Sequence, residues 1–139
     1  MIAKVRSSGF TLLELLLVIV IGAIAVSGVV MALPSSQNRQ LTQEADRLAA
    51  LLESARARSR ATGEAVYFQA EGKKMGFTGA QTQSILPAHW MYPDTLAKPV
   101  QLILGPEPVI DAQRVVIEQS GLSKVVSSDG VRPFVTESP

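Results

Sequence analysis

Hydrophobic and polar residues divide this chain into three stretches with different periods. After nine residues that include Lys4 and Arg6, the stretch 10–33 is almost uninterrupted hydrocarbon. From residue 37 to residue 62, apolar side chains recur every three or four positions, which is the period of an amphipathic helix. After Gly63 the pattern changes to short alternating runs that are typical of strands. The apolar stretch is longer than the ~20 residues that a helix needs to cross a bilayer.

The middle stretch predicts one helix with a single apolar face. Gly63 is the expected stop, because glycine favours the left-handed conformation that ends helices. Before it, Pro34 is expected to kink or interrupt the helix, since proline removes one hydrogen bond. Ser35 and Ser36 then offer oxygens to the free donors of a restarted turn. The predicted apolar stripe consists of Leu41, Ala45, Leu48, Leu52 and Ala55, widened by Ala49 and Leu51.

Charged residues decorate the same helix. Glu44–Arg47 and Glu53–Arg56 have the i,i+3 spacing of modest ion pairs. Arg56, Arg58 and Arg60 cluster in the last turns, where cations complement the helix dipole. This cluster has the composition of a phosphate-binding patch, but a solvated helix end explains it more simply.

The last stretch predicts a small antiparallel sheet. Pro133 cannot donate a ladder hydrogen bond, so the run around it is expected to be an edge strand. Ser128-Asp129-Gly130 has the composition of a hairpin turn, and residues 78–99 are irregular. The predicted strands cover 65–70, 74–77, 100–104, 114–118, 124–126 and 131–135.

The apolar face of a lone amphipathic helix must be buried against another element, and so must the apolar face of a small sheet. The predicted fold is therefore α+β: a long N-terminal helix, with an apolar half and an amphipathic half, packed on a small antiparallel sheet. We divide the chain into residues 1–9, 10–33, 34–63 and 64–139.

Composition excludes several classes of site. The chain has no cysteine and one histidine, which excludes disulfides, thiol catalysis and histidine-rich metal centres. Residues 1–63 carry seven Lys/Arg against four Asp/Glu, and residues 64–139 carry six against eight. The acidic C-terminal part offers no basic footprint for nucleic acid.

No pattern favours catalysis. His89 stands beside Trp90, but no acid or nucleophile is placed to work with it, so we expect a loop anchor in which Trp90 closes the core. Asp94, Glu107 and Asp111 are flanked by prolines and glycines, which favours turn roles. The sequence predicts neither an enzyme nor a cofactor or metal site.

One acid, Glu14, lies inside the apolar stretch. An ionised group in lipid is costly, so it implies a partner or a proton. Lys4 and Arg6 precede the stretch, which favours a cytoplasmic leader. An ordinary signal anchor with a tolerated acid is one alternative. A cleavable secretory signal ending near Ala23-Ile24-Ala25 is another, but the apolar run continues past that point.

The segment Gly9-Phe10-Thr11-Leu12-Leu13-Glu14 after a short basic leader resembles the class III signal of type IV pilins and type II secretion pseudopilins. The resemblance implies that a prepilin peptidase cuts after Gly9 and methylates the new amino terminus at Phe10. It implies that Glu14 pairs with a neighbouring subunit's terminal amine. Glu14 is four residues from Phe10 and so shares its helical face.

Two later segments are similar to the H-type minor pseudopilins of type II secretion. They are Asp46 to Arg56 followed by Ala61-Thr62-Gly63, and Leu104-Gly105-Pro106-Glu107-Pro108 ahead of a strand. The C-terminus is short for that branch.

The likeness implies a subunit near the tip of a periplasmic pseudopilus that helps export folded proteins across the outer membrane. Its partners would be the I-, J- and K-type minor pseudopilins, the major pseudopilin, the prepilin peptidase/methylase and the inner-membrane assembly platform. It would cross the bacterial inner membrane once, with the N-terminus cytoplasmic and the C-terminal domain periplasmic.

Two other functions stay open. The first is a minor pilin of type IV pili, acting in pilus biogenesis or DNA uptake, although the acidic C-terminal part argues against DNA. The second is a signal-anchored periplasmic binding or enzyme domain.

Overall fold

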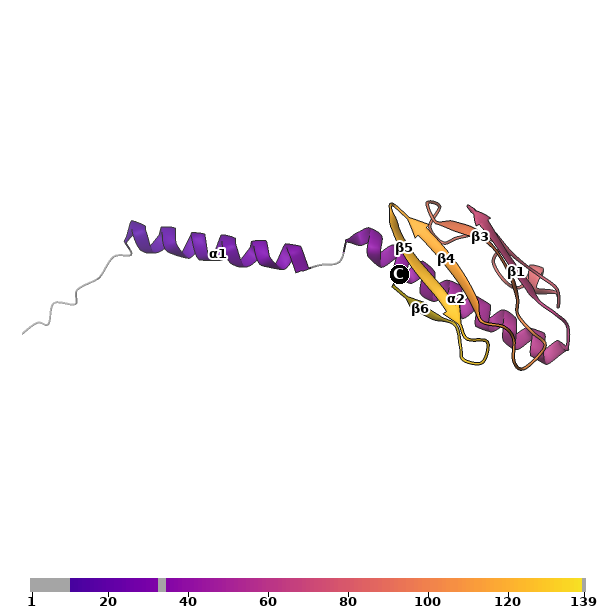
Figure 1. Cartoon of the computed structure of the whole chain (residues 1–139). Coiled ribbons are helices and arrows are strands. Elements are labelled where there is room, and N and C mark those ends of the chain that lie inside the picture. Colours follow the sequence, from indigo (N-terminus) through magenta and orange to yellow (C-terminus); the bar gives the residue numbers. More distant parts are fainter. Residues whose placement is uncertain (1–10, 33–34, 139) are drawn as a thin grey trace, which may run out of the picture. The chain divides into compact units, whose positions relative to one another are not determined.

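The computed structural model describes residues 11–32 and 35–138. The chain divides into two units between Pro34 and Ser35. The first unit contains helix α1, and the second contains helix α2 and all the described strands (Figure 1).

Helix α1 spans Leu12–Ala32. It has no polar face opposite an apolar one, because nearly every residue in it is apolar. The side chains of residues 11–24 are all exposed within the chain. A helix that is apolar all round has no stripe that selects one packing surface.

Helix α2 spans Ser36–Thr62, and both predicted caps are confirmed. The Ser35 hydroxyl accepts a hydrogen bond from the Asn38 N–H at 3.2 Å. Gly63 has a φ of 72°, and its N–H donates to the Ser59 carbonyl at 2.9 Å. Glycine adopts this left-handed conformation without the steric cost that a Cβ brings.

The predicted apolar stripe of α2 is also confirmed. All five stripe residues are buried, with Ala49 at the edge of the same cluster and Leu51 partly buried. The other side of α2 carries exposed polar and small residues, including Gln43, Asp46 and Ser54. Packing of the buried face on the sheet therefore stabilises α2 more than intrinsic helix propensity does.

The sheet has six antiparallel strands in the order β2-β1-β3-β4-β5-β6. Helix α2 packs against β4, β5 and β6 on one face of the sheet (Figure 1). This confirms the α+β fold of a helix followed by a small antiparallel sheet, which is consistent with a type IV pilin-like fold. The strands are Tyr67–Gly72 (β1), Lys74–Thr78 (β2), Leu96–Ile103 (β3), Gln113–Gln119 (β4), Leu122–Ser128 (β5) and Val135–Glu137 (β6).

The segment 79–95, which includes the 3-10 helix η1 (Thr82–Ser84), is tied to α2 along its length. The Arg58 Nε donates to the Ala80 carbonyl at 2.6 Å, and the Glu44 carboxylate accepts from the Tyr92 N–H at 2.9 Å. Between these ties, Trp90 is only 6% exposed and joins the main core cluster. The prediction that Trp90 closes the core is confirmed.

Strand β3 begins at Leu96, earlier than the predicted 100–104, although Pro99 lies within it. Ala70 pairs with Val100 and Gly72 with Ala97, so the register shifts around Pro99. A proline is tolerated at such a bulge because no ladder donor is required there.

The predicted edge strand at 131–135 was wrong in position, since β6 spans Val135–Glu137. The backbone before β6 is bound elsewhere. The Phe134 N–H donates to the Glu53 carboxylate at 2.9 Å, and the Arg132 carbonyl accepts from the Ser128 hydroxyl at 2.7 Å. These side-chain bonds occupy groups that a strand would use, so the ladder starts later.

Candidate functional site at the start of the first helix

Thr11 caps the start of α1. Its carbonyl accepts hydrogen bonds from the N–H groups of Glu14, at 3.0 Å, and Leu15, at 3.2 Å. Its hydroxyl also accepts from the Glu14 N–H at 3.3 Å. Thr11 and Glu14 have the Thr-x-x-Glu spacing of a capping box, in which the acid stands three residues after the cap.

The Glu14 side chain is exposed and is the only acid in the first turn of α1. Negative charge is stabilised at a helix N-terminus, where the first N–H groups have no intrahelical acceptor. Within residues 11–32 and 35–138, this carboxylate forms no ion pair. The site therefore presents an acid at the rim of an apolar helix, free to pair with a cation.

The residues predicted to flank this acid lie outside the described ones. They are Gly9 and Phe10 at the expected cleavage point and Pro34 at the expected kink. Their roles stay predictions. In the described part of the chain, no helix has both the length and the apolarity required to cross a membrane.

Residues 4–30 match the model of a family described as the prokaryotic N-terminal methylation motif. The match includes Gly9, Phe10 and Glu14. Comparison with curated proteins and with solved structures gave no match.

This match supports a type IV pilin-like or pseudopilin protein. The motif implies processing by a prepilin peptidase and assembly with other pilin-like subunits, and it indicates an inner-membrane-anchored pilin. The capped first turn of α1 is compatible with that chemistry, since it presents Glu14 near the predicted new N-terminus.

The arginine cluster at the end of α2 is not the solvated helix end that we expected. Arg56 is 1% exposed, and its guanidinium donates to the carbonyls of Arg132, at 3.1 Å, and Gly130. Glu53 lies 3.6 Å from it, so the predicted ion pair forms, but with a buried cation. Burying a charge requires such compensating partners.

The other two arginines of the cluster also bind loops. Arg58 holds the Ala80 carbonyl, and the Arg60 Nη2 donates to the Pro108 carbonyl at 3.2 Å. The loop at Gly130 is further shaped by Asp129, whose carboxylate accepts from the Val131 and Arg132 N–H groups. These backbone hydrogen bonds hold the pKa of Asp129 below its ordinary value. The last turns of α2 thus organise three loops and leave no open phosphate site.

Glu44 is a second buried charge in α2, and its burial was not predicted. It is 1% exposed, with Arg47 at 3.1 Å. The signal was present in the spacing. Glu44 lies three residues after Leu41 and four before Leu48, and Arg56 lies four after Leu52, so both continue the buried stripe.

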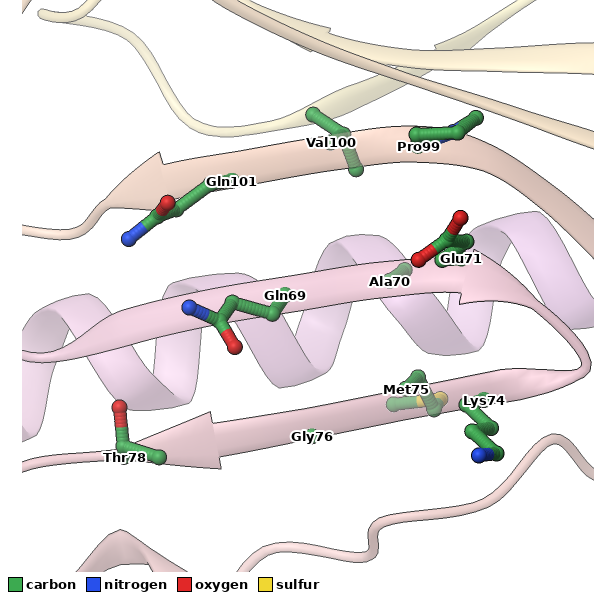
Figure 2. A pocket seen from close by; sticks show the side chains of 10 residues that line it. All are labelled: Gln69, Ala70, Glu71, Lys74, Met75, Gly76, Thr78, Pro99, Val100 and Gln101. Carbon is green, nitrogen blue, oxygen red and sulfur yellow. The ribbon is translucent and has the colours of Figure 1, made fainter.

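The outer face of the sheet, away from α2, carries a hollow of about 450 Å³ over β1, β2 and β3 (Figure 2). Gln69 and Gln101 line it side by side, and Gly76 leaves open space because a Cβ there would touch nothing within 4 Å. Its titratable side chains are Glu71 and Lys74. This lining has no nucleophile placed beside a base.

The remaining candidates are dispersed. His89 is exposed and contributes only its carbonyl, which accepts from Arg47 at 3.3 Å. Asp94 lies 3.9 Å from Lys73, while Glu107 and Asp111 are exposed in the loop before β4. Among the described residues, no three acids or histidines gather closely enough to hold a metal ion.

Proposed function

We propose that this protein is an H-type minor pseudopilin of a type II secretion system. It would be a structural subunit at or near the tip of the pseudopilus, where it supports export of folded proteins across the outer membrane. The observation that carries the proposal is the methylation motif at residues 4–30, followed by a helix packed on an antiparallel sheet.

The H-type assignment rests on the likeness of two segments, Asp46 to Arg56 with Ala61-Thr62-Gly63 and Leu104 to Pro108. Arg60, which lies between the two parts of the first segment, donates to the Pro108 carbonyl at 3.2 Å. The second segment therefore lies beside the C-terminal end of α2.

Under this proposal α1 has two environments in turn. As a membrane-stored subunit it is surrounded by lipid, and in the pseudopilus it is surrounded by the helices of other subunits. Glu14 then accepts the cationic amine of a neighbour's processed Phe10. Such a pair is screened little by water, so its attraction exceeds that of a surface ion pair.

The protein would act without catalysis or cofactor. Its partners would be I-, J- and K-type minor pseudopilins and the major pseudopilin. It would be anchored by residues 10–33 in the inner membrane, with the domain 64–139 in the periplasm. Helix α2 and the sheet would determine which subunits it contacts.

The first test is processing. The full chain is expressed with a prepilin peptidase, and the mature N-terminus is determined by mass spectrometry. We expect cleavage after Gly9 and one methyl group on Phe10. Gly9→Val should leave the full-length precursor and abolish secretion. Unchanged mobility and secretion in that variant would favour a signal-anchored domain instead.

The second test concerns Glu14. Glu14→Val should leave cleavage and membrane insertion intact, because neither needs the carboxylate, but should lower incorporation into the fibre about tenfold or more. Cross-linking to the major pseudopilin measures incorporation. The matched control is Leu16→Val in the same helix, which should assemble normally. Full assembly and secretion with Glu14→Val would refute the pairing role.

A minor pilin of type IV pili is the second candidate, since the methylation motif is common to both systems. It predicts support of pilus assembly rather than secretion. If it serves DNA uptake, the domain should bind DNA with an affinity that falls steeply with salt.

A further inference from the structure

All four lysines of residues 35–138 lie at one end of the sheet, which we call the lysine end. Lys73 and Lys74 are at the β1–β2 turn, Lys98 is near the start of β3, and Lys124 is near the start of β5. This is also the end at which α2 begins. The Gln119 side chain at the end of β4 donates to the Gln40 side chain in the second turn of α2 at 3.3 Å.

Three of these lysines are exposed, and Lys124 is half-buried. Lys73 and Lys98 are 66% and 64% exposed, and their ammonium groups lie 3.9 Å from Asp94 and 3.4 Å from Glu118. Exposed pairs of this kind contribute little and are easily exchanged for other partners. Lys124 donates to the Ser138 hydroxyl at 3.0 Å.

The lysine end carries a small excess of positive charge. Arg39, near the start of α2, adds a fifth cation to the four lysines. The acids at this end are Glu71, Asp94, Glu118 and Glu137. At the opposite end, Arg56, Arg58 and Arg60 donate to backbone carbonyls, while Arg114 and Arg132 are exposed.

Exposed apolar side chains accompany the lysines. Met91 is 50% exposed, Leu96 at the start of β3 is 42% exposed and Leu122 at the start of β5 is 36% exposed. Lysines beside apolar side chains suit the boundary between lipid headgroups and acyl chains. There the ammonium groups meet phosphate and the apolar atoms leave water.

The lysine end is joined to α1 by a short stretch of sequence. Ser36, the first residue of α2, follows Ala32, the last of α1, by only four positions. We propose that the lysine end docks on anionic phospholipid headgroups while the subunit is stored in the membrane. This inference rests on the proposed function, because it requires α1 in the bilayer.

The test uses the full chain in lipid nanodiscs. The chain has no cysteine, so a single Ser120→Cys variant places one fluorophore at the lysine end. Val131→Cys, at the opposite end, is the matched control, since Val131 is 64% exposed. A quencher attached to the lipid headgroups reports contact, in discs of phosphatidylglycerol and phosphatidylcholine or of phosphatidylcholine alone.

We expect strong quenching at position 120 in the anionic discs, weak quenching in the neutral ones, and little at position 131 in either. Lys74→Gln with Lys124→Gln should lower the ratio of docked to undocked domain about twenty-five-fold, at about fivefold per lysine. Arg114→Gln with Arg132→Gln removes the same charge from the other end and should change nothing. Unaltered Trp90 fluorescence shows that each variant is folded.

Three results would overturn the docking surface. The first is equal quenching in neutral and anionic discs, and the second is an unchanged ratio of docked to undocked domain in the lysine variant. The third is quenching that grows with the number of subunits per disc, because it would indicate that a second copy of the chain occupies the surface. A lysine variant that is cleaved after Gly9 and assembled normally but no longer docks would confirm docking as a separate property. Docking by a wild-type chain that is never cleaved after Gly9 would refute the proposed function alone.

Discussion

The two helices of this chain solve opposite packing problems. Helix α1 exposes every described side chain and is apolar all round, while α2 buries one face and leaves the other in water. The contrast shows which surroundings stabilise each helix. Helix α2 is completed by its own sheet, whereas α1 is apolar all round and is the one element described in its unit.

The largest expected loss of stability comes from removing the buried cation of α2. Arg56→Ala removes a fully buried side chain and one donor from each of two loop carbonyls, which keep the Ser128 hydroxyl and a 3.4 Å bond from the Ile110 N–H. The free energy of unfolding should fall by about 3–4 kcal/mol. Urea unfolding of the detergent-solubilised full chain, followed by Trp90 fluorescence, measures it, because the only tryptophan lies in the domain core. The exposed control Arg39→Ala should change it by less than about 0.5 kcal/mol, and a similarly small loss for Arg56→Ala would mean that the buried network is dispensable.

A matched pair of leucines tests the contrast directly. Leu52 in α2 is fully buried, and Leu16 in α1 is 56% exposed. Leu52→Ala should lower the stability of the domain by about 3 kcal/mol, since it leaves a cavity, whereas Leu16→Ala should leave the same unfolding curve unchanged. Equal effects of the two substitutions would show that α1 packs on the domain and would remove the distinction between the helices.

A pair of glycines should give small effects of opposite sign. Gly63→Ala forces a Cβ into a left-handed cap and should destabilise the domain by about 1 kcal/mol. Gly22→Ala lies inside α1 with open space around it and should slow hydrogen exchange of neighbouring α1 amides about fivefold. A stabilising Gly63→Ala would contradict the cap, and unchanged exchange in Gly22→Ala would contradict a regular helix there.

Much of the fold was predictable because its elements are strongly periodic. The 3–4 spacing from Leu41 to Ala55 and the stop at Gly63 predicted α2 to within a residue at its start. The β1–β2 hairpin followed from the turn at Gly72. The bounds of β6 were not predictable, because they depend on Glu53 and Ser128 binding the backbone around residues 132–134 from other elements.

The candidate site residues were also predictable only in part. Glu14 could be predicted as a site residue because an acid is unusual in an apolar run. Thr11, three residues before it, gives that turn a local role as a helix cap, since the Thr11 hydroxyl accepts from the Glu14 N–H. Arg56 was misjudged because its charge suggested a solvated helix end, and the burial of Glu44 was not predicted. Their burial depends on carbonyls and N–H groups that only the folded loops bring within reach.

By itself, the sequence determined the order of the elements, the apolar and amphipathic helices, the methylation motif and the acid within it. These depend on residue types and spacings within one or two turns, where local physics suffices. Only the tertiary structure decided that three arginines bind three loops and that the four lysines of the domain share one end. Those facts follow from sheet topology, which brings together residues separated by up to 90 positions and is not written in any local period.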